Sequence, residues 1–321
     1  MNRRTAVRAV AGILVSVVAC LLVAQSADVP AAFGRVLAVD PRWLVLPILV
    51  VAVQLGIRAV RWRILLSAVG PVPLGTRQVV GHLAAGYLGN TVLPARLGEV
   101  VRIVLVSRRT GVPATTATAS VVLERAVDLL ALLAIATGAS GVIGATGWLP
   151  FAAMLALLVV LGVALPATGW VAAHVPSVLP VRVRDVFVRF VLAFGQARPP
   201  VIVRAWLLSL LAWSCDALVV WLCAQALGVP IGPGVAILIS SGAAVGAALP
   251  GAAGYVGTYE LGAVTMATFA GVPAEEALQI ALLGHAMAVL PLALMGLVSV
   301  VVMGVVPASP AYRAVPAGAE R

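Results

Sequence analysis

Long apolar runs constrain the fold of this chain more than any other feature of its sequence. An α-helix needs about 20 apolar residues to cross a bilayer. Six candidate spans of that kind follow one another: Ala9–Gln25, Trp43–Leu66, Pro113–Thr137, Trp148–Pro166, Val203–Ala226 and Glu276–Val305. Only 10% of the 321 residues are charged, against about 25% in a soluble domain. The sequence therefore predicts an all-α, polytopic membrane helix bundle.

The first span has a second interpretation. Arg3, Arg4 and Arg8 precede its apolar run, as in a signal peptide, and "VVAC" (Val17–Cys20) resembles a lipoprotein cleavage box. The apolar run nevertheless continues past that cysteine, where a mature lipoprotein normally becomes polar. We expect an uncleaved first span.

The basic and sulfur-containing residues exclude other protein classes. The net charge is +10, but the arginines that carry it are scattered beside apolar spans, so we expect no nucleic-acid partner. The three cysteines, Cys20, Cys215 and Cys223, lie in apolar runs without metal-ligand spacing. The sequence predicts no disulfide, metal or cofactor, and we expect no enzymatic activity.

The distribution of arginine predicts how the chain crosses the membrane. Loops on the cytoplasmic side of a membrane are enriched in basic residues. With the N-terminus inside, most arginines, including Arg58, Arg61 and Arg102, fall on the cytoplasmic side, and only Arg35 and Arg42 fall outside. We therefore expect a multi-pass protein of the cytoplasmic (inner) membrane with both termini in the cytoplasm.

Two further apolar stretches, Arg77–Val106 and Gly234–Ala270, do not fit as simple spans. Each is broken near its middle by Leu-Pro followed by glycine, and each must return to the side from which it came. A re-entrant hairpin and a pair of full spans both satisfy that parity. We expect re-entrant hairpins, because sixteen helical residues before the first break reach only about 24 Å.

The two broken stretches also resemble each other. "TVLPARLG" (Thr91–Gly98) and "AALPGAAG" (Ala247–Gly254) share Leu-Pro and a glycine four residues after the proline. One stretch is predicted to enter from inside and the other from outside, as in the inverted-topology repeats of transporters. We expect one membrane domain, residues 1–321. Its parts are a first repeat (43–137), a connecting span with an amphipathic cytoplasmic elbow (138–200), a second repeat (201–305) and a cytoplasmic tail (306–321).

Polar residues gather at these breaks and within the spans, where a charge costs about 2.5–3.5 kcal/mol on insertion scales. Internal ion pairs that hold helices together would explain the charges, but not the helix breaks. A half-helix N-terminus suits an anion, and arginine matches phosphate oxygens. We expect Arg96 to bind a head group, Glu99 to hold Arg96, and the other acids to pair or to carry protons. The candidate site is Asn90, Pro94, Arg96, Glu99, Arg102, Glu124, Arg125, Asp128, Pro250, Gly254, Tyr259, Glu260 and His285.

Three motifs, "NTVLPARLGEVVR", "ERAVDLL" and "LPGAAGYVGTYE", resemble the lysylphosphatidylglycerol synthase transmembrane-region family, the flippase-like membrane domain of the multiple peptide resistance factor. The resemblance covers about Arg8–Val305. It implies a translocase that moves aminoacylated phospholipid to the outer leaflet. The resemblance also implies a set of conserved positions: Asn90, Pro94, Arg96, Gly98, Glu99, Arg102, Glu124, Arg125, Asp128, Pro250, Gly254 and Glu260. His285 stands where such proteins often carry arginine, and we find no aminoacyl-transfer domain in the sequence.

Three functions follow from these observations. The first is a flippase-like translocase for a membrane phospholipid, an aminoacyl lipid or a polyprenyl-phosphate lipid. The second is a non-transporting accessory subunit beside a partner transferase that modifies lipid or glycan. The third is an intramembrane enzyme of head-group transfer, for which the sequence offers neither a metal site nor a nucleophile.

The segment Val181–Arg198 is basic and amphipathic. We expect it to contact anionic lipids of the inner leaflet or to be an ordinary elbow between the two repeats.

Overall fold

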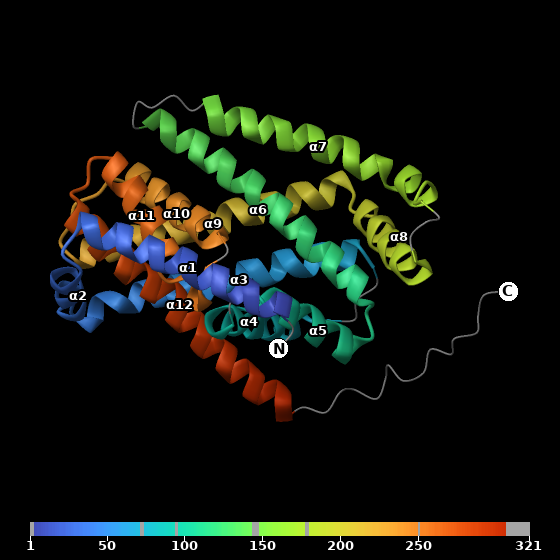
Figure 1. Cartoon of the computed structure of the whole chain (residues 1–321), viewed down its shortest axis with the longest axis horizontal. Helices are drawn as coiled ribbons and strands as arrows, with labels where there is room; N and C mark the ends of the chain where they lie inside the picture. Colours follow the sequence, from blue (N-terminus) through green and yellow to red (C-terminus); the bar gives the residue numbers. More distant parts are fainter. Residues whose placement is uncertain are drawn as a thin grey trace.

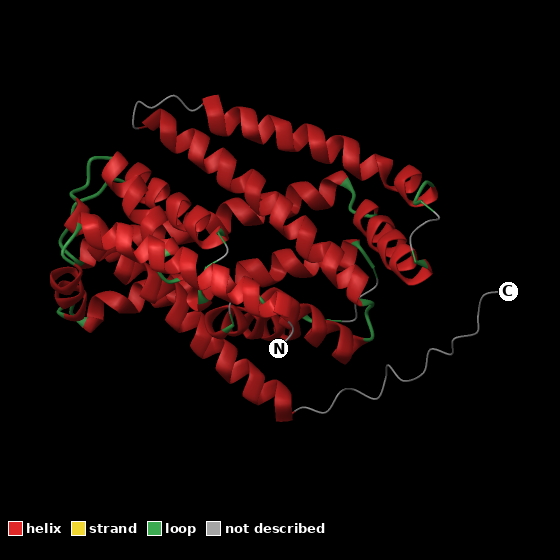
Figure 2. Ribbon diagram, viewed as in Figure 1, coloured by secondary structure: helices red, strands yellow, loops and turns green. Residues whose placement is uncertain are grey.

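The computed structural model describes residues 3–70, 74–93, 96–142, 148–176, 180–249 and 251–305. Within these ranges the chain consists of helices and loops, without strands (Figure 2). Pro94, Pro250 and the expected tail 306–321 lie outside the described residues.

The helices follow the apolar runs closely. Figure 1 shows them as one bundle; their bounds are α1 (Arg3–Ser26), α2 (Val29–Leu37), η1 (Pro41–Leu44), α3 (Val45–Ala68), α4 (Thr76–Val92), α5 (Gly98–Thr110), α6 (Ala114–Val142), α7 (Trp148–Ala173), α8 (Val181–Gly195), α9 (Pro199–Ala226), α10 (Pro233–Ala248), η2 (Ala253–Tyr255), α11 (Thr258–Phe269) and α12 (Ala274–Val305).

Four described helical segments are long and apolar enough to cross a membrane: Pro41–Ala68, Met154–Ala173, Pro199–Ala226 and Ala274–Val302. A fifth crossing is obtained if α1 and α2, which meet at an angle of 89°, form one bent span. The bend itself was missed in the sequence. Asp28 ends the first run and caps α2 by accepting a hydrogen bond from the Ala31 backbone N–H at 3.0 Å. The length and apolar composition of these four or five helical segments confirm a multi-pass membrane protein.

The largest difference from an expected span boundary is at the end of α7. We expected the span that begins at Trp148 to end at Pro166, but α7 continues through that proline to Ala173. A proline inside a helix removes one backbone hydrogen bond without necessarily ending the helix. The elbow forms α8, which packs against α6 and α7; its contact with lipid stays a prediction.

Glycine lets the two arms of each broken stretch approach closely. α4 packs on α5, and a β-carbon added at Gly89 would lie 2.7 Å from the Gly98 Cα. α10 packs on α11 in the same way, where a β-carbon added at Gly262 would lie 3.2 Å from the Gly246 Cα. Small residues at such crossings let helix backbones meet inside a membrane.

The N-terminal helix is attached to the second break. Ser16 of α1 accepts a hydrogen bond from the Ala252 backbone N–H at 2.8 Å. A β-carbon added at Gly12 would lie 2.9 Å from the Gly251 carbonyl oxygen, so the two backbones are close. α1 also packs along α11.

We predict that Gly89→Ala lowers the melting temperature of the purified protein. The added methyl group meets backbone rather than a movable side chain, and overpacking of this kind costs about 1–3 kcal/mol. Gly56→Ala on α3 is the matched control, because nothing lies within 4 Å of its added β-carbon and alanine is the better helix former. Equal melting temperatures for the two variants would contradict the close α4–α5 contact.

Candidate functional site

The two helix breaks meet inside the bundle. From the first break, the Arg96 side chain donates to the Ala247 carbonyl oxygen at the end of α10, from Nε at 3.0 Å and from Nη2 at 2.5 Å. Its guanidinium carbon lies 5.5 Å from the ring centre of Tyr255, in the second break. The two breaks therefore face each other, and the Arg96 side chain lies between them.

Both contacting residues have left-handed backbone conformations. The φ angle is +57° at Arg96 and +62° at Tyr255. Residues with a Cβ rarely adopt this region, which costs roughly 1–2 kcal/mol. Such strain is commonly held at functional positions, and here it turns two side chains toward each other.

A cavity of about 180 Å³ lies where the breaks meet. One water needs about 10–15 Å³ of such space, so the cavity has room for a much larger group. Its wall comes from α3, α4, α5, α6, α9, α10, α11 and α12 and from both breaks. Seven of the residues expected from the sequence line it: Asn90, Arg96, Glu99, Arg102, Arg125, Asp128 and Tyr259.

Glu124 lies beside this cavity at the centre of an ion-pair cluster. Its carboxylate is fully buried, 2.8 Å from Arg61 of α3, 2.8 Å from Arg102 of α5 and 2.8 Å from Arg125 of its own helix. Asp128, one turn further along α6, also pairs with Arg61. The shared face expected for Glu124 and Asp128 is therefore confirmed.

Arg102 retains hydrogen-bonding capacity despite its ion pair. Only 3% of the residue is exposed, and its Nε and Nη2 atoms have no hydrogen-bond partner among the described residues. Its guanidinium stacks over Trp62, with 4.8 Å between the guanidinium carbon and the ring centre. An unpartnered buried donor costs about 1–3 kcal/mol, so an acceptor that entered the cavity would relieve that cost at Arg102.

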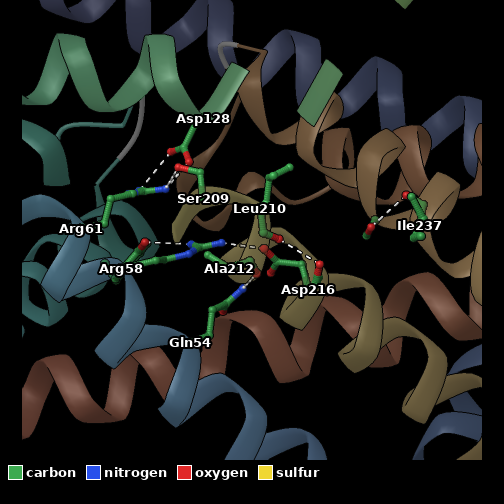
Figure 3. Close-up of polar contacts among 12 residues, drawn as sticks. Gln54, Arg58, Arg61, Asp128, Ser209, Leu210, Ala212, Asp216 and Ile237 are labelled. Carbon is green, nitrogen blue, oxygen red and sulfur yellow. Dashed lines mark hydrogen bonds and ion pairs between the residues drawn. The ribbon is translucent and has the colours of Figure 1, made fainter. Parts of the chain in front are cut away.

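A second ion pair lies at another wall of the cavity. Figure 3 shows Arg58 pointing toward Asp216, beside the Arg61–Asp128 pair. The distance from Arg58 Nη2 to Asp216 Oδ2 is 2.6 Å. The Arg58 guanidinium also donates to the Tyr87 hydroxyl at 2.8 Å and lies 5.7 Å from the ring centre of Trp213.

Three more of the expected residues, Gly254, Glu260 and His285, form a separate cluster. His285 of α12 lies 2.5 Å from a Glu260 carboxylate oxygen through Nδ1 and 2.7 Å from the Gly254 carbonyl oxygen through Nε2. Its ring stacks on Tyr259 at 4.3 Å. Glu260 in turn accepts from the Gly257 backbone N–H at 2.8 Å. This cluster ties α11 and α12 to the second break, and of its members only Tyr259 lines the cavity.

One expectation about charged residues was wrong. Glu99 does not hold Arg96; its nearest cation is Arg125 at 3.6 Å, because Arg96 turns away toward α10. Arg58, Arg61 and Arg102 are held inside the bundle by carboxylates, and the side of the membrane toward which they lie stays a prediction.

Sequence reasoning missed Arg58, Arg61, Tyr87 and Trp213 as site residues. The signal was present for the arginines: Arg58 and Arg61 are three residues apart within the predicted span Trp43–Leu66. Residues at that spacing share a helix face, and charges inside a span usually have partners. For the aromatic residues, no pattern in the sequence distinguished them from ordinary span residues.

The fold and this cavity define a polytopic helical membrane protein with a charged cavity within its bundle. The chain belongs to the family of the lysylphosphatidylglycerol synthase TM region, which matches residues 9–296. Among curated proteins it is similar to "Glycosyltransferase AglD" of Haloferax volcanii, with 28% identity over 326 aligned positions. That alignment covers 86% of this chain and 51% of the relative, so the chain spans about half the length of the curated protein it matches.

We predict that Arg61→Ala strongly destabilises the protein, because it leaves buried Glu124 and Asp128 with fewer partners. Breaking a buried pair costs about 3–5 kcal/mol. Arg63→Ala is the control, since Arg63 lies on the same helix but is exposed, bonded to Thr76 at 2.8 Å; surface changes stay within about 0.5 kcal/mol. Thermal unfolding in detergent measures both, and similar melting temperatures would refute the role of Arg61.

Proposed function

We propose that this protein is a lipid translocase of the flippase type, which moves a phosphate-bearing lipid between the leaflets of the cytoplasmic membrane. The observation that carries the proposal is the cavity at the meeting point of the two breaks. Arg96 and Arg102 both line it, and Arg102 has buried nitrogen atoms without described partners.

Phosphate recognition follows from the chemistry of these two side chains. Guanidinium groups bind phosphate oxygens through parallel N–H donors, and the low local dielectric strengthens that attraction. Arg96 takes part in no ion pair among the described residues, and its carbonyl partner carries no net charge. In the proposal, Arg96 and Arg102 hold the phosphate, while Glu99, Glu124 and Asp128 balance the arginines or exchange protons.

The two broken stretches supply a route for movement. We propose that α4–α5 and α10–α11 are re-entrant hairpins of two inverted repeats, residues 43–137 and 201–305, and that both termini are cytoplasmic. Support comes from the matching glycine contacts within each hairpin and from the paired left-handed residues Arg96 and Tyr255. Rocking of one repeat against the other would open the cavity to each leaflet in turn. No catalytic step is required of the chain.

A second candidate function is an accessory membrane subunit of a lipid- or glycan-modifying enzyme. One observation favours it: the curated relative is named a glycosyltransferase, and the match covers about half of that protein. Such a subunit would position a lipid for a partner transferase without moving it. It would co-purify with that enzyme and would show no lipid movement alone.

We predict that Arg102→Ala and Arg96→Ala each slow the movement of fluorescent phosphatidylglycerol across reconstituted vesicles by at least about tenfold, equivalent to roughly 1.4 kcal/mol of lost phosphate binding. Arg42→Ala removes one arginine from an exposed position that pairs with Asp40, and it should leave the rate unchanged. Melting temperatures confirm that each variant is folded. Folded arginine variants with wild-type rates would rule out phosphate binding by these residues, and a wild-type protein without movement would favour the accessory function.

A further inference from the structure

One wall of the cavity has the composition of a site for an organic cation, and the chain fills that site itself. Tyr87 and Trp213 place their ring centres 5.8 and 5.7 Å from the Arg58 guanidinium carbon, and Asp216 lies 2.6 Å from Arg58 Nη2. Aromatic faces with a carboxylate are typical partners of ammonium groups. An incoming ammonium group would have to displace Arg58 from all three partners.

The charge of the cavity favours an anion. Among the described residues that line it or pair directly with its wall, the arginines are Arg58, Arg61, Arg96, Arg102 and Arg125. The carboxylates of the same set are Glu99, Glu124, Asp128 and Asp216. Five cations against four anions leave a formal charge of +1. In a poorly solvated interior a ligand of charge −1 neutralises this excess, whereas a cationic ligand adds to it.

Unsatisfied polar atoms indicate what accompanies the phosphate. Trp213 Nε1 and Asn90 Oδ1 are buried without a described hydrogen-bond partner, and both residues line the cavity. The indole N–H needs an acceptor and the amide oxygen needs a donor. A hydroxyl group supplies both functions, while an ammonium group can only donate.

We infer that Arg58 makes the cavity selective for a phosphodiester head group of net charge −1 that carries an uncharged polyol or sugar, and that it excludes head groups with an ammonium group. This inference rests on the proposed lipid binding and names its substrate class. Arg58 is a specificity-determining residue here: it occupies the aromatic and acidic wall, and Arg96 and Arg102 bind the phosphate.

The test compares two lipids that differ in the head group. The full chain is reconstituted into phosphatidylcholine vesicles with acyl-labelled phosphatidylglycerol or phosphatidylethanolamine, and the rate of movement between leaflets is measured. Wild-type protein should move phosphatidylglycerol at least tenfold faster. Arg58→Gln should reduce that ratio about tenfold, mainly by raising the phosphatidylethanolamine rate, because Asp216 and the two rings become available.

Two further variants separate charge from position. Arg63→Gln removes the same charge from an exposed site on α3, and the ratio should stay at the wild-type value. The double variant R58Q/D216N restores the formal charge of +1 and removes the acid, so the preference for phosphatidylglycerol should return.

The wild-type protein alone also tests the inference, in case Arg58→Gln does not fold. Soluble glycerophosphoglycerol should slow the movement of labelled phosphatidylglycerol, and glycerophosphoethanolamine at the same concentration should not. Equal rates for the two lipids, equal inhibition by the two head groups, or an unchanged ratio in folded Arg58→Gln would overturn the inference while leaving lipid translocation intact. A wild-type protein that moves neither lipid would overturn the proposed function as well.

Discussion

The architecture depends on how the chain keeps charges inside an apolar bundle. Glu124 is the clearest case, because a fully buried carboxylate is surrounded by arginines from α3, α5 and α6. Burying the Glu124 carboxylate without a partner would be strongly destabilising. Its ion pairs with arginines of three helices fix the positions of those helices relative to one another. Two of these arginines, Arg102 and Arg125, also line the cavity, so interactions that hold the bundle together contribute to the charge of the cavity wall.

The helix breaks act on this framework in a complementary way. Ion pairs position whole helices, whereas the breaks bring backbone and irregular chain to the interior, where such backbone must contact protein or a polar cavity. Arg96 satisfies the Ala247 carbonyl oxygen and contacts Tyr255 at once. One side chain therefore joins segments that are distant in sequence, and it does so at the edge of the space that a ligand would occupy.

Apolar length and helix-breaking residues were sufficient to predict most helices, because both act locally. The helix bounds agree with the candidate spans within six residues except at α7, and its continuation past Pro166 shows that a single proline does not decide where a helix ends. Partners were harder to predict. Which carboxylate meets Arg61, or whether Glu99 faces Arg96 or Arg125, depends on the rotation of each helix about its axis. Sequence spacing gives the shared face within a helix, as for Glu124 and Asp128, but not the neighbour across it.

The hydrogen bond between Ser16 and the Ala252 backbone N–H gives α1 a role that its composition does not suggest. No described residue of α1 lines the cavity, and the exposed side chains described on it include Ile13, Leu14 and Leu21. The second break nevertheless cannot move unless this hydrogen bond breaks or α1 moves with it. A displacement of α1 would therefore be transmitted through this bond to the second break, whose Tyr255 lines the cavity.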